Sequence, residues 1–171
     1  MNWDSISIQV TTLLQDLLRF DTTNPPGNET PCVEYIAATL KREGIESQVF
    51  ESAPGRGNLV ARLKGDGSLS PLILMGHVDV VTAEADKWQH PPFSGDLVDG
   101  IVWGRGATDM KNMVAMELMV FMLLKREGVP LKRDKLEETE WWVKPNLLGF
   151  HKYAKPLYSI LSTRMQTDNN R

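Results

Sequence analysis

Two side chains able to support metal or acid–base chemistry, His77 and Asp79, lie two residues apart. On an extended segment this spacing projects both side chains to the same face. A histidine that binds a metal through one ring nitrogen commonly has a carboxylate on the other nitrogen, which fixes its tautomer. The pair therefore indicates a metal site or a catalytic group, with a structural histidine at a strand end as the alternative.

A second acidic candidate, Asp109, precedes an apolar segment that predicts a helix over residues 112–127. Its carboxylate could bind a metal, or it could cap this helix or supply a charge to its first turn, a contribution of about 1 kcal/mol. The neighbouring Gly104 and Gly106 allow close backbone approach but lack the spacing of a phosphate-binding loop. The sequence therefore disfavours a nucleotide site here.

Two helices are predicted ahead of these candidates. Apolar residues at three- and four-residue intervals predict the first over residues 6–20, with Asp4 or Ser5 as its cap. Thr30 followed by Pro31 predicts the start of the second, which should end near Gly44. Cys32 falls in its first turn and is expected to be a packing residue, because a small buried thiol is more common there than a reactive one.

Strands are predicted over residues 46–50, 58–63 and 72–81. The last begins as a nearly continuous apolar run, which is typical of a central strand buried on both faces, and it leads directly into His77 and Asp79. Helices alternating with such strands predict an α/β layered sheet. In such sheets, reactive groups gather at the carboxyl ends of the strands.

Composition excludes several other classes of protein. The 171 residues are 42% hydrophobic and 24% charged, as in an ordinary globular domain, and the net charge is −3. No basic cluster is available to neutralise a phosphate backbone, so we expect no nucleic-acid partner. A single cysteine excludes an internal disulfide, and neither a membrane span nor a secretory signal is evident. The cytoplasm is the predicted location.

Three motifs in the middle of the chain together resemble one known family. They are GHVDVV at 76–81, Trp88 with Pro92-Phe93, and DGIVWGRGATDMK at 99–111. Their order and spacing resemble those of the M20 zinc metallopeptidases, which include aminoacylases, succinyl-diaminopimelate desuccinylases, acetylornithine deacetylases and glutamate carboxypeptidases. With similar upstream segments, the resemblance covers residues 5–134.

This resemblance implies part of a three-layer α/β catalytic domain, with a central mixed sheet, flanking helices and no lid domain. It implies that His77 binds one zinc ion, that Asp109 bridges two, and that Asp79 is the catalytic-site residue that orients His77. Two zinc ions, or Co²⁺ or Mn²⁺ in their place, would activate a water molecule to attack an amide. The implied substrate is a small peptide or an N-acyl amino acid, and a homodimer is expected only for the intact protein. His90 matches no family ligand, so we expect it to pack in its loop.

The remainder, residues 135–171, departs from the family. The family places an Asp-Glu-Glu motif after a further buried strand, with one glutamate as base and one as ligand. Here Glu137-Glu138 follows no apolar strand and comes several residues too soon after Asp109, so a solvated acidic face is the simpler interpretation. We therefore predict a family domain over 1–134 and a poorly ordered, non-family tail over 135–171, produced by an interruption of the gene near Asp134.

Three functional hypotheses follow. The leading one is the N-terminal half of a zinc-dependent amide hydrolase, which would bind metal weakly and hydrolyse little, because His77 and Asp109 supply fewer ligands than zinc usually has. The second is a non-catalytic protein-interaction module that keeps the fold. The third, a small nucleotide-binding protein, is disfavoured because no Lys-Ser pair follows Gly104 and Gly106.

Overall fold

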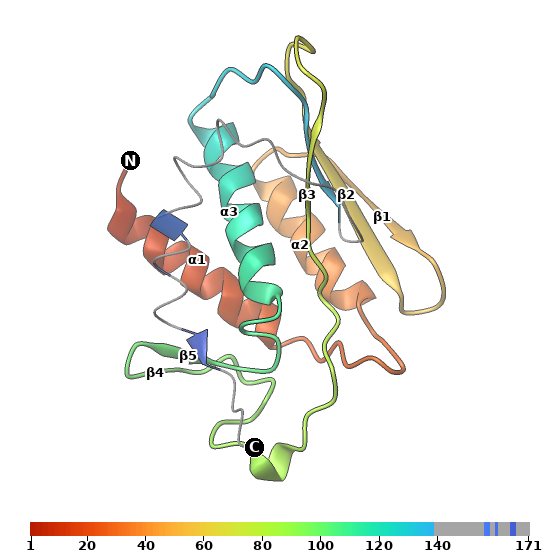
Figure 1. Ribbon diagram of the computed structural model, residues 1–171, viewed down its shortest axis with the longest axis vertical. Helices are drawn as coiled ribbons and strands as arrows, with labels where there is room; N and C mark the ends of the chain where they lie inside the picture. The colour runs from red at the N-terminus through yellow and green to blue at the C-terminus, as the bar shows by residue number, and fades with distance from the viewer. Residues whose placement is uncertain (139–155, 158–159, 161–164, 167–171) are drawn as a thin grey trace.

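A computed structural model describes residues 1–138, 156–157, 160 and 165–166 of the chain, and it shows helices packed on a mixed sheet (Figure 1). The predicted α/β class is confirmed. In chain order the elements are α1 (Trp3–Leu18), α2 (Thr30–Arg42), β1 (Ser47–Glu51), β2 (Gly57–Leu63), β3 (Leu72–Met75), the 3-10 turn η1 (Ala85–Lys87), β4 (Leu97–Val98), β5 (Ile101–Trp103), α3 (Lys111–Arg126), β6 (Lys135–Glu138) and β7 (Met165–Gln166).

The helix starts differ from the sequence prediction. Asn2 caps α1, because its side-chain oxygen accepts hydrogen bonds from the backbone N–H groups of Asp4 and Ser5 at 3.1 and 3.3 Å. The prediction of Asp4 or Ser5 as the cap is therefore wrong, since both lie in the first turn and donate. Helix α2 includes Thr30 itself, and Glu29 occupies the cap position without a side-chain cap bond.

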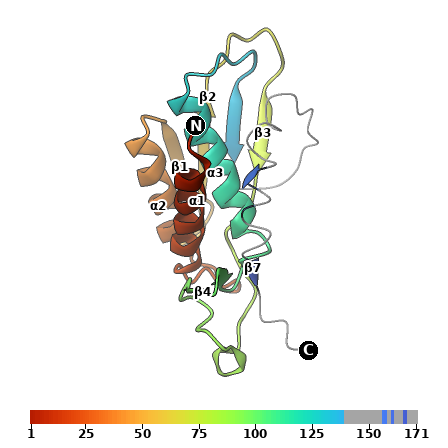
Figure 2. The same ribbon diagram turned by 90° about the vertical axis from the view of Figure 1, so that its left-hand side faces the viewer.

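The apolar core lies between the helices and the sheet, and α3 contributes most to it. Most of its side chains are buried, and it runs between α1 and the sheet (Figure 2). Phe121, Leu118 and Met119 are fully buried there. Cys32 of α2 is fully buried as well, and burial raises the pKa of its thiol to about 11. The expected packing role of this cysteine is confirmed.

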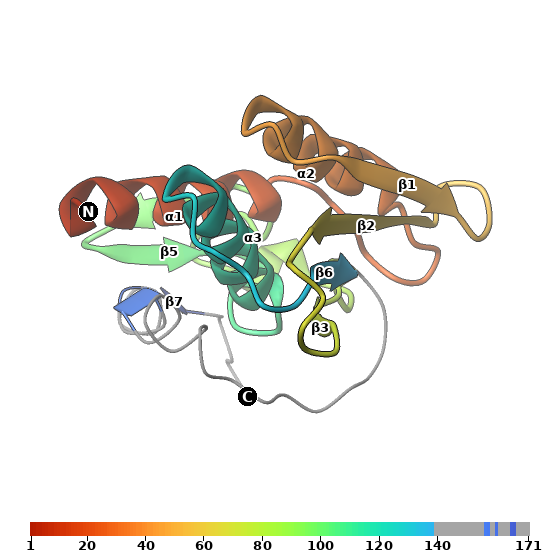
Figure 3. The ribbon, with the colours of Figure 1, turned by 90° about the horizontal axis from the view of Figure 1, so that it is seen from above.

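The main sheet has the strand order β1-β2-β6-β3 (Figure 3). Strands β1 and β6 both run antiparallel to β2, whereas β6 and β3 run parallel, so the sheet is mixed as predicted. Within the described sheet β3 lies at an edge, where the sequence predicted a central strand. The neighbour that separates it from β2 is β6, which the sequence did not predict.

Strand β3 is also shorter than the predicted strand over 72–81. It ends at Met75, and its pairing with the described residues of β6 runs from Leu72↔Lys135 to Met75↔Glu138. The chain then continues alongside residues 22–24, with a bridge between Thr23 and Val80. The segment that carries His77 and Asp79 is therefore held by a loop rather than by a strand.

Residues 135–138 are part of the fold. They form β6, so the backbone of Glu137 and Glu138 lies in a strand that the sequence did not predict. The solvated acidic face stays a prediction, because the side chains of these two residues lie outside the described part. Further along, Leu157 is fully buried in the core and β7 pairs with β5 through Val102↔Met165. The predicted boundary after residue 134 does not coincide with the end of the sheet, and the predicted disorder of the tail falls largely outside the described residues.

None of the described helices has the combination of length and apolar character that crossing a bilayer requires. A cytoplasmic location stays a prediction.

Candidate metal centre

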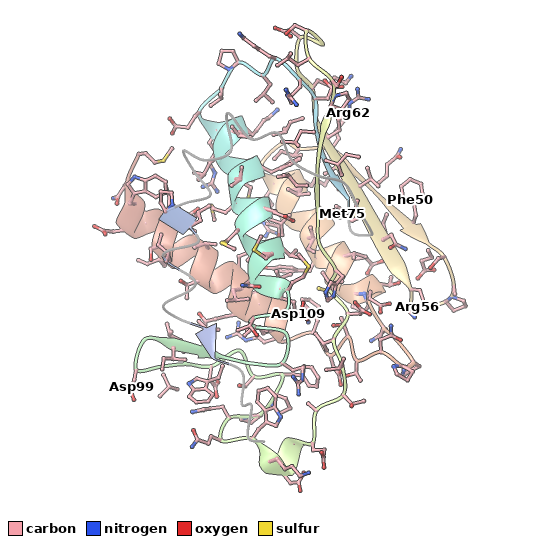
Figure 4. The ribbon with its side chains drawn as sticks, in the orientation of Figure 1. Phe50, Arg56, Arg62, Met75, Asp99 and Asp109 are labelled. Carbon is pink, nitrogen blue, oxygen red and sulfur yellow. The ribbon has the colours of Figure 1, made fainter. Side chains whose placement is uncertain are left out.

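The candidate residues meet because β3 and α3 run in opposite directions. The carboxyl end of β3 and the first turn of α3 lie at the same end of the molecule (Figure 1). His77 and Asp79 follow β3, and Asp109 precedes α3. Figure 4 shows Asp109 at the base of α3, below the level of Met75, the last residue of β3. The residues that follow the strand and the residue that precedes the helix therefore lie close together, as in other α/β sites.

The two ring nitrogens of His77 face two different carboxylates. Nδ1 lies 2.9 Å from Asp79 Oδ1, and Nε2 lies 3.3 Å from Asp109 Oδ1. When the neutral imidazole carries its proton on Nδ1, the backbone carbonyl of Asp79 accepts the hydrogen bond at 3.1 Å, with the Asp79 carboxylate beside it, and Nε2 directs a lone pair toward Asp109. A lone pair and a carboxylate repel each other unless a proton or cation lies between them. The geometry therefore fits a divalent cation held by His77 and Asp109.

Asp109 is free to take this role because it does not cap α3. Met110 is the N-cap residue, and no side chain makes a cap hydrogen bond. The carboxyl side chain of Asp109 is 86% exposed and that of His77 is 40% exposed. The alternative in which Asp109 serves only as a helix cap is therefore wrong.

The pair opens into a pocket of about 420 Å³. This volume falls in the range of small-molecule sites, and the lining mixes carboxylates, an arginine and exposed apolar surface. The lining residues are Asn24, His77, Asp79, Val80, Val81, Arg105, Gly106, Thr108 and Asp109.

Asn24 supports the site from a loop that the sequence predicted only as a turn. Its side-chain amide donates to Asp79 Oδ2 at 2.9 Å, and its backbone N–H donates to the carbonyl of Val80 at 2.8 Å. The hydroxyl of Thr22 donates to the carbonyl of Val78 at 2.6 Å. These contacts explain why the segment after β3 keeps a defined path without strand partners. The sequence feature that could have pointed to Asn24 is its position directly before two prolines in a long loop.

Lys111 is the second residue that sequence reasoning missed. Its Nζ donates to the carbonyl oxygens of Leu17 and Phe20, both at 2.9 Å, and the side chain is fully buried. Burial lowers the pKa of this amine. Lys111 thus joins the first turn of α3 to the last turn of α1, two residues after Asp109.

His90 packs away from the pair, in agreement with the expected loop role. Its ring lies 4.7 Å from the Trp103 ring, centroid to centroid, and its Nδ1 is 3.3 Å from Asp96 Oδ2. It does not line the pocket that holds His77.

A model of peptidase family M20/M25/M40 matches residues 73–137, the span that carries His77, Asp79, Asp109 and most of β6. The chain belongs to the M20 family. The match extends three residues beyond the predicted family boundary at 134, and the described sheet extends four.

Curated relatives agree with this assignment to M20. The chain is 34% identical over 126 residues to N-formyl-4-amino-5-aminomethyl-2-methylpyrimidine deformylase of Bacillus subtilis, a match of 71% of the chain and 30% of the relative. It is 37% identical over 121 residues to succinyl-diaminopimelate desuccinylase of Methylobacterium radiotolerans, with 68% and 30% covered. The chain thus spans about 30% of the length of these relatives.

The fold agrees with that of M20 structures. An M20 metallo-carboxypeptidase from Sulfolobus solfataricus superposes with a TM-score of 0.68 at 20% identity, over 77% of this chain and 30% of the other. A dinuclear metal-binding M20 peptidase from Bacillus subtilis superposes with a TM-score of 0.59 at 15% identity, over 80% and 35%.

The described part of this M20 chain provides a partial donor set. Among the described residues, no group of three or more His, Cys, Asp or Glu side chains gathers closely enough to hold a metal ion. His77 and Asp109 are two candidate donors, and the side chains of Glu137 and Glu138 lie outside the described part.

Proposed function

We propose that this chain carries the first part of a metal-dependent amide hydrolase site, with His77 and Asp109 as metal ligands and Asp79 as the residue that orients His77. The observation that carries the proposal is the 3.3 Å approach of His77 Nε2 to Asp109 Oδ1, while Asp79 occupies Nδ1. That arrangement leaves a lone pair and a carboxylate facing each other in a solvent-accessible pocket.

The donor types favour zinc, because mixed imidazole and carboxylate ligands suit it, and they also accept Co²⁺ or Mn²⁺. When bound, the metal supplies Lewis-acid polarisation of an amide carbonyl and activation of water. Asp79 lies against Nδ1 of His77 and orients the ring. The side-chain amide of Asn24 in turn fixes the carboxylate of Asp79 by donating a hydrogen bond to its Oδ2. The site thus has its orienting groups in place even where its ligand set is partial.

The substrate class we propose is an amide or peptide bond of a small molecule, such as an N-acyl amino acid. Relatives named as a deformylase and a desuccinylase, together with a solved carboxypeptidase, support this class. Because the two donors found among the described residues are fewer than the three or four that zinc sites ordinarily have, we expect weak metal binding and little hydrolysis from this chain.

Metal titration tests this proposal with a matched control. His77 and His90 each have an aspartate at hydrogen-bond distance, but only His77 faces a second carboxylate. We expect Zn²⁺ to raise the melting temperature of the unmodified chain and of the His90→Asn variant. The melting temperatures of the His77→Asn and Asp109→Asn variants should be the same with and without Zn²⁺. A metal-linked shift that survives His77→Asn would contradict the assignment. No shift in any variant would favour the non-catalytic interaction module.

A further inference from the structure

Strand β1 forms an edge of the main sheet. It pairs with β2 on one side over all 5 of its residues, and no described strand lies on its other side (Figures 1 and 3). At the adjoining turn, the backbone N–H of Ser52 donates to the carbonyl of Arg56 at 3.1 Å. The direction of the backbone groups alternates along an antiparallel pair. The N–H and C=O groups of Ser47, Val49 and Glu51 therefore point away from β2.

This edge lacks the features that usually prevent the strands of two molecules from pairing. Edge strands commonly carry a lysine, a proline or a bulge, or another element covers them. None of these is found at β1 in the described part of the chain: its sequence is SQVFE, and each residue has one partner in β2. Val49 and Phe50 are 39% and 51% exposed. The edge therefore presents apolar side chains together with backbone donors and acceptors.

Helix α2 lies along this edge and runs opposite to β1. The hydroxyl of Thr30, at the start of the helix, donates to Glu51 Oε1 at 2.5 Å, and Lys41, near its end, lines a groove of about 900 Å³ together with Ser47. The helix contacts both β1 and β2, so its axis lies over the line between two strands about 4.8 Å apart. A second copy paired at the edge would place its own α2 about 10 Å from the first, which is a normal spacing for packed helices.

The side of α2 that borders the groove is self-complementary in charge. Ala37, Ala38 and Lys41 line the groove. Glu34, Ala38 and Lys41 are exposed and share one face of the helix, because they are four and three residues apart. A two-fold axis makes two copies of α2 antiparallel, so that Lys41 of one copy faces Glu34 of the other. The alanines between the two charges allow the helices to approach.

We propose that β1 pairs antiparallel with β1 of a second copy of this chain, around a two-fold axis at Val49. The two copies of Val49 exchange backbone hydrogen bonds, and Ser47 of each copy pairs with Glu51 of the other. A second copy fits this edge better than an unrelated strand does, because the face of α2 that carries Glu34 and Lys41 complements itself. The dimer needs only α2 and β1, whereas the sequence led us to expect a homodimer only for the intact protein.

Sedimentation velocity of the full chain at increasing concentration tests the proposal. We expect a monomer–dimer equilibrium. Val49→Lys should raise the dissociation constant of the dimer by about tenfold or more, because the two-fold axis sets two lysines directly opposite each other. Ile8→Lys is the matched control, since Ile8 is 67% exposed and lies on α1, away from β1, and it should leave this constant unchanged. A monomer at every concentration, or a dimer that Val49→Lys does not weaken, would overturn the proposal.

Charge reversal on α2 gives a second measurement, which does not depend on how the strand variant folds. Lys41→Glu and Glu34→Lys should each weaken the dimer, since the symmetry places like charges against each other twice. An equimolar mixture of the two variants should form a heterodimer with the affinity of the unmodified chain, because the basic helix of one then faces the acidic helix of the other. A mixture that dimerises no more tightly than either variant alone would overturn the antiparallel pairing of α2.

Discussion

The side-chain amide of Asn24 donates to Asp79 Oδ2 at 2.9 Å, while Asp79 Oδ1 lies 2.9 Å from His77 Nδ1. One carboxylate thus connects the loop before α2 to the histidine after β3. Each oxygen of Asp79 has its own partner, so the carboxylate cannot rotate without losing a contact. Asn24 is therefore a positioning residue for the candidate metal ligand.

Asn24→Ala should lower zinc affinity about 10- to 100-fold, because outer partners of metal ligands contribute at this level. Competition with a chromophoric chelator measures the change. Asn28→Ala is the control, since Asn28 lies in the same loop, is exposed and does not line the pocket. Equal zinc affinity in Asn24→Ala and the unmodified chain would show that Asp79 holds its orientation without Asn24.

Asp109→Asn should leave the metal-free protein as stable as before, within about 0.5 kcal/mol, because the side chain is 86% exposed and caps no helix. It should at the same time abolish the stabilisation by zinc. Urea unfolding with and without zinc measures both effects. A loss of about 0.5–2 kcal/mol in the metal-free protein would restore the helix-cap role.

Glu117 should make the stability fall as pH rises. Burial of its carboxyl group raises its pKa to about 7, whereas in the unfolded chain it titrates near 4.5. Between these values the folded state binds more protons than the unfolded state, so the free energy of unfolding decreases with pH through this window, by up to about 3 kcal/mol.

Urea unfolding at several values between pH 5 and pH 8 measures this slope, and Glu117→Gln provides the comparison because it cannot ionise. We expect the free energy of unfolding of the variant to rise relative to that of the unmodified chain up to about pH 7, and the difference to level off above that pH. A constant difference between the two proteins over this range would show that Glu117 is ionised in the folded state.

Lys111→Met should destabilise the fold by about 1–3 kcal/mol. The substitution keeps most of the aliphatic stem but leaves the carbonyl oxygens of Leu17 and Phe20 without their buried donor. Lys125→Met, at an exposed position of the same helix, is the control. Thermal unfolding compares the two, and an increase in stability would mean that burying the ammonium group costs more than its two hydrogen bonds contribute.

Cys32 should resist alkylation in the folded protein. It is fully buried, and its pKa of about 11 keeps the thiol protonated at neutral pH. We expect iodoacetamide to label it only as the chain unfolds in urea, as followed by mass spectrometry. Rapid labelling without denaturant would show that α2 opens locally or that the thiol is accessible.

Short-range patterns predicted the three candidate residues that the structure brings together. The two-residue spacing of His77 and Asp79, and the position of Asp109 ahead of an apolar helix, are local features. The opposed directions of β3 and α3 then bring them together. Asn24 could not be found in the same way, because its partner Asp79 lies far along the chain and no periodic pattern connects them.

Local sequence patterns also failed to predict one strand of the sheet, β6. Residues 135–138 contain a single apolar side chain, Leu136, so no strand signal is visible in the sequence. Their backbone pairs on both sides, with β2 and β3, and that pairing makes them a strand. Tertiary contacts therefore decide the element where local composition does not.

The place of β6 between β2 and β3 sets an order of events during synthesis. The β1–β2 hairpin joins segments close together in the chain and can form early. Strand β3 is made next but has no neighbour in the sheet until residues 135–138 have been translated, since β6 is its partner. The ribosome must therefore complete α3 and β6 before β3 is fixed in the sheet and the histidine that follows it acquires its final position.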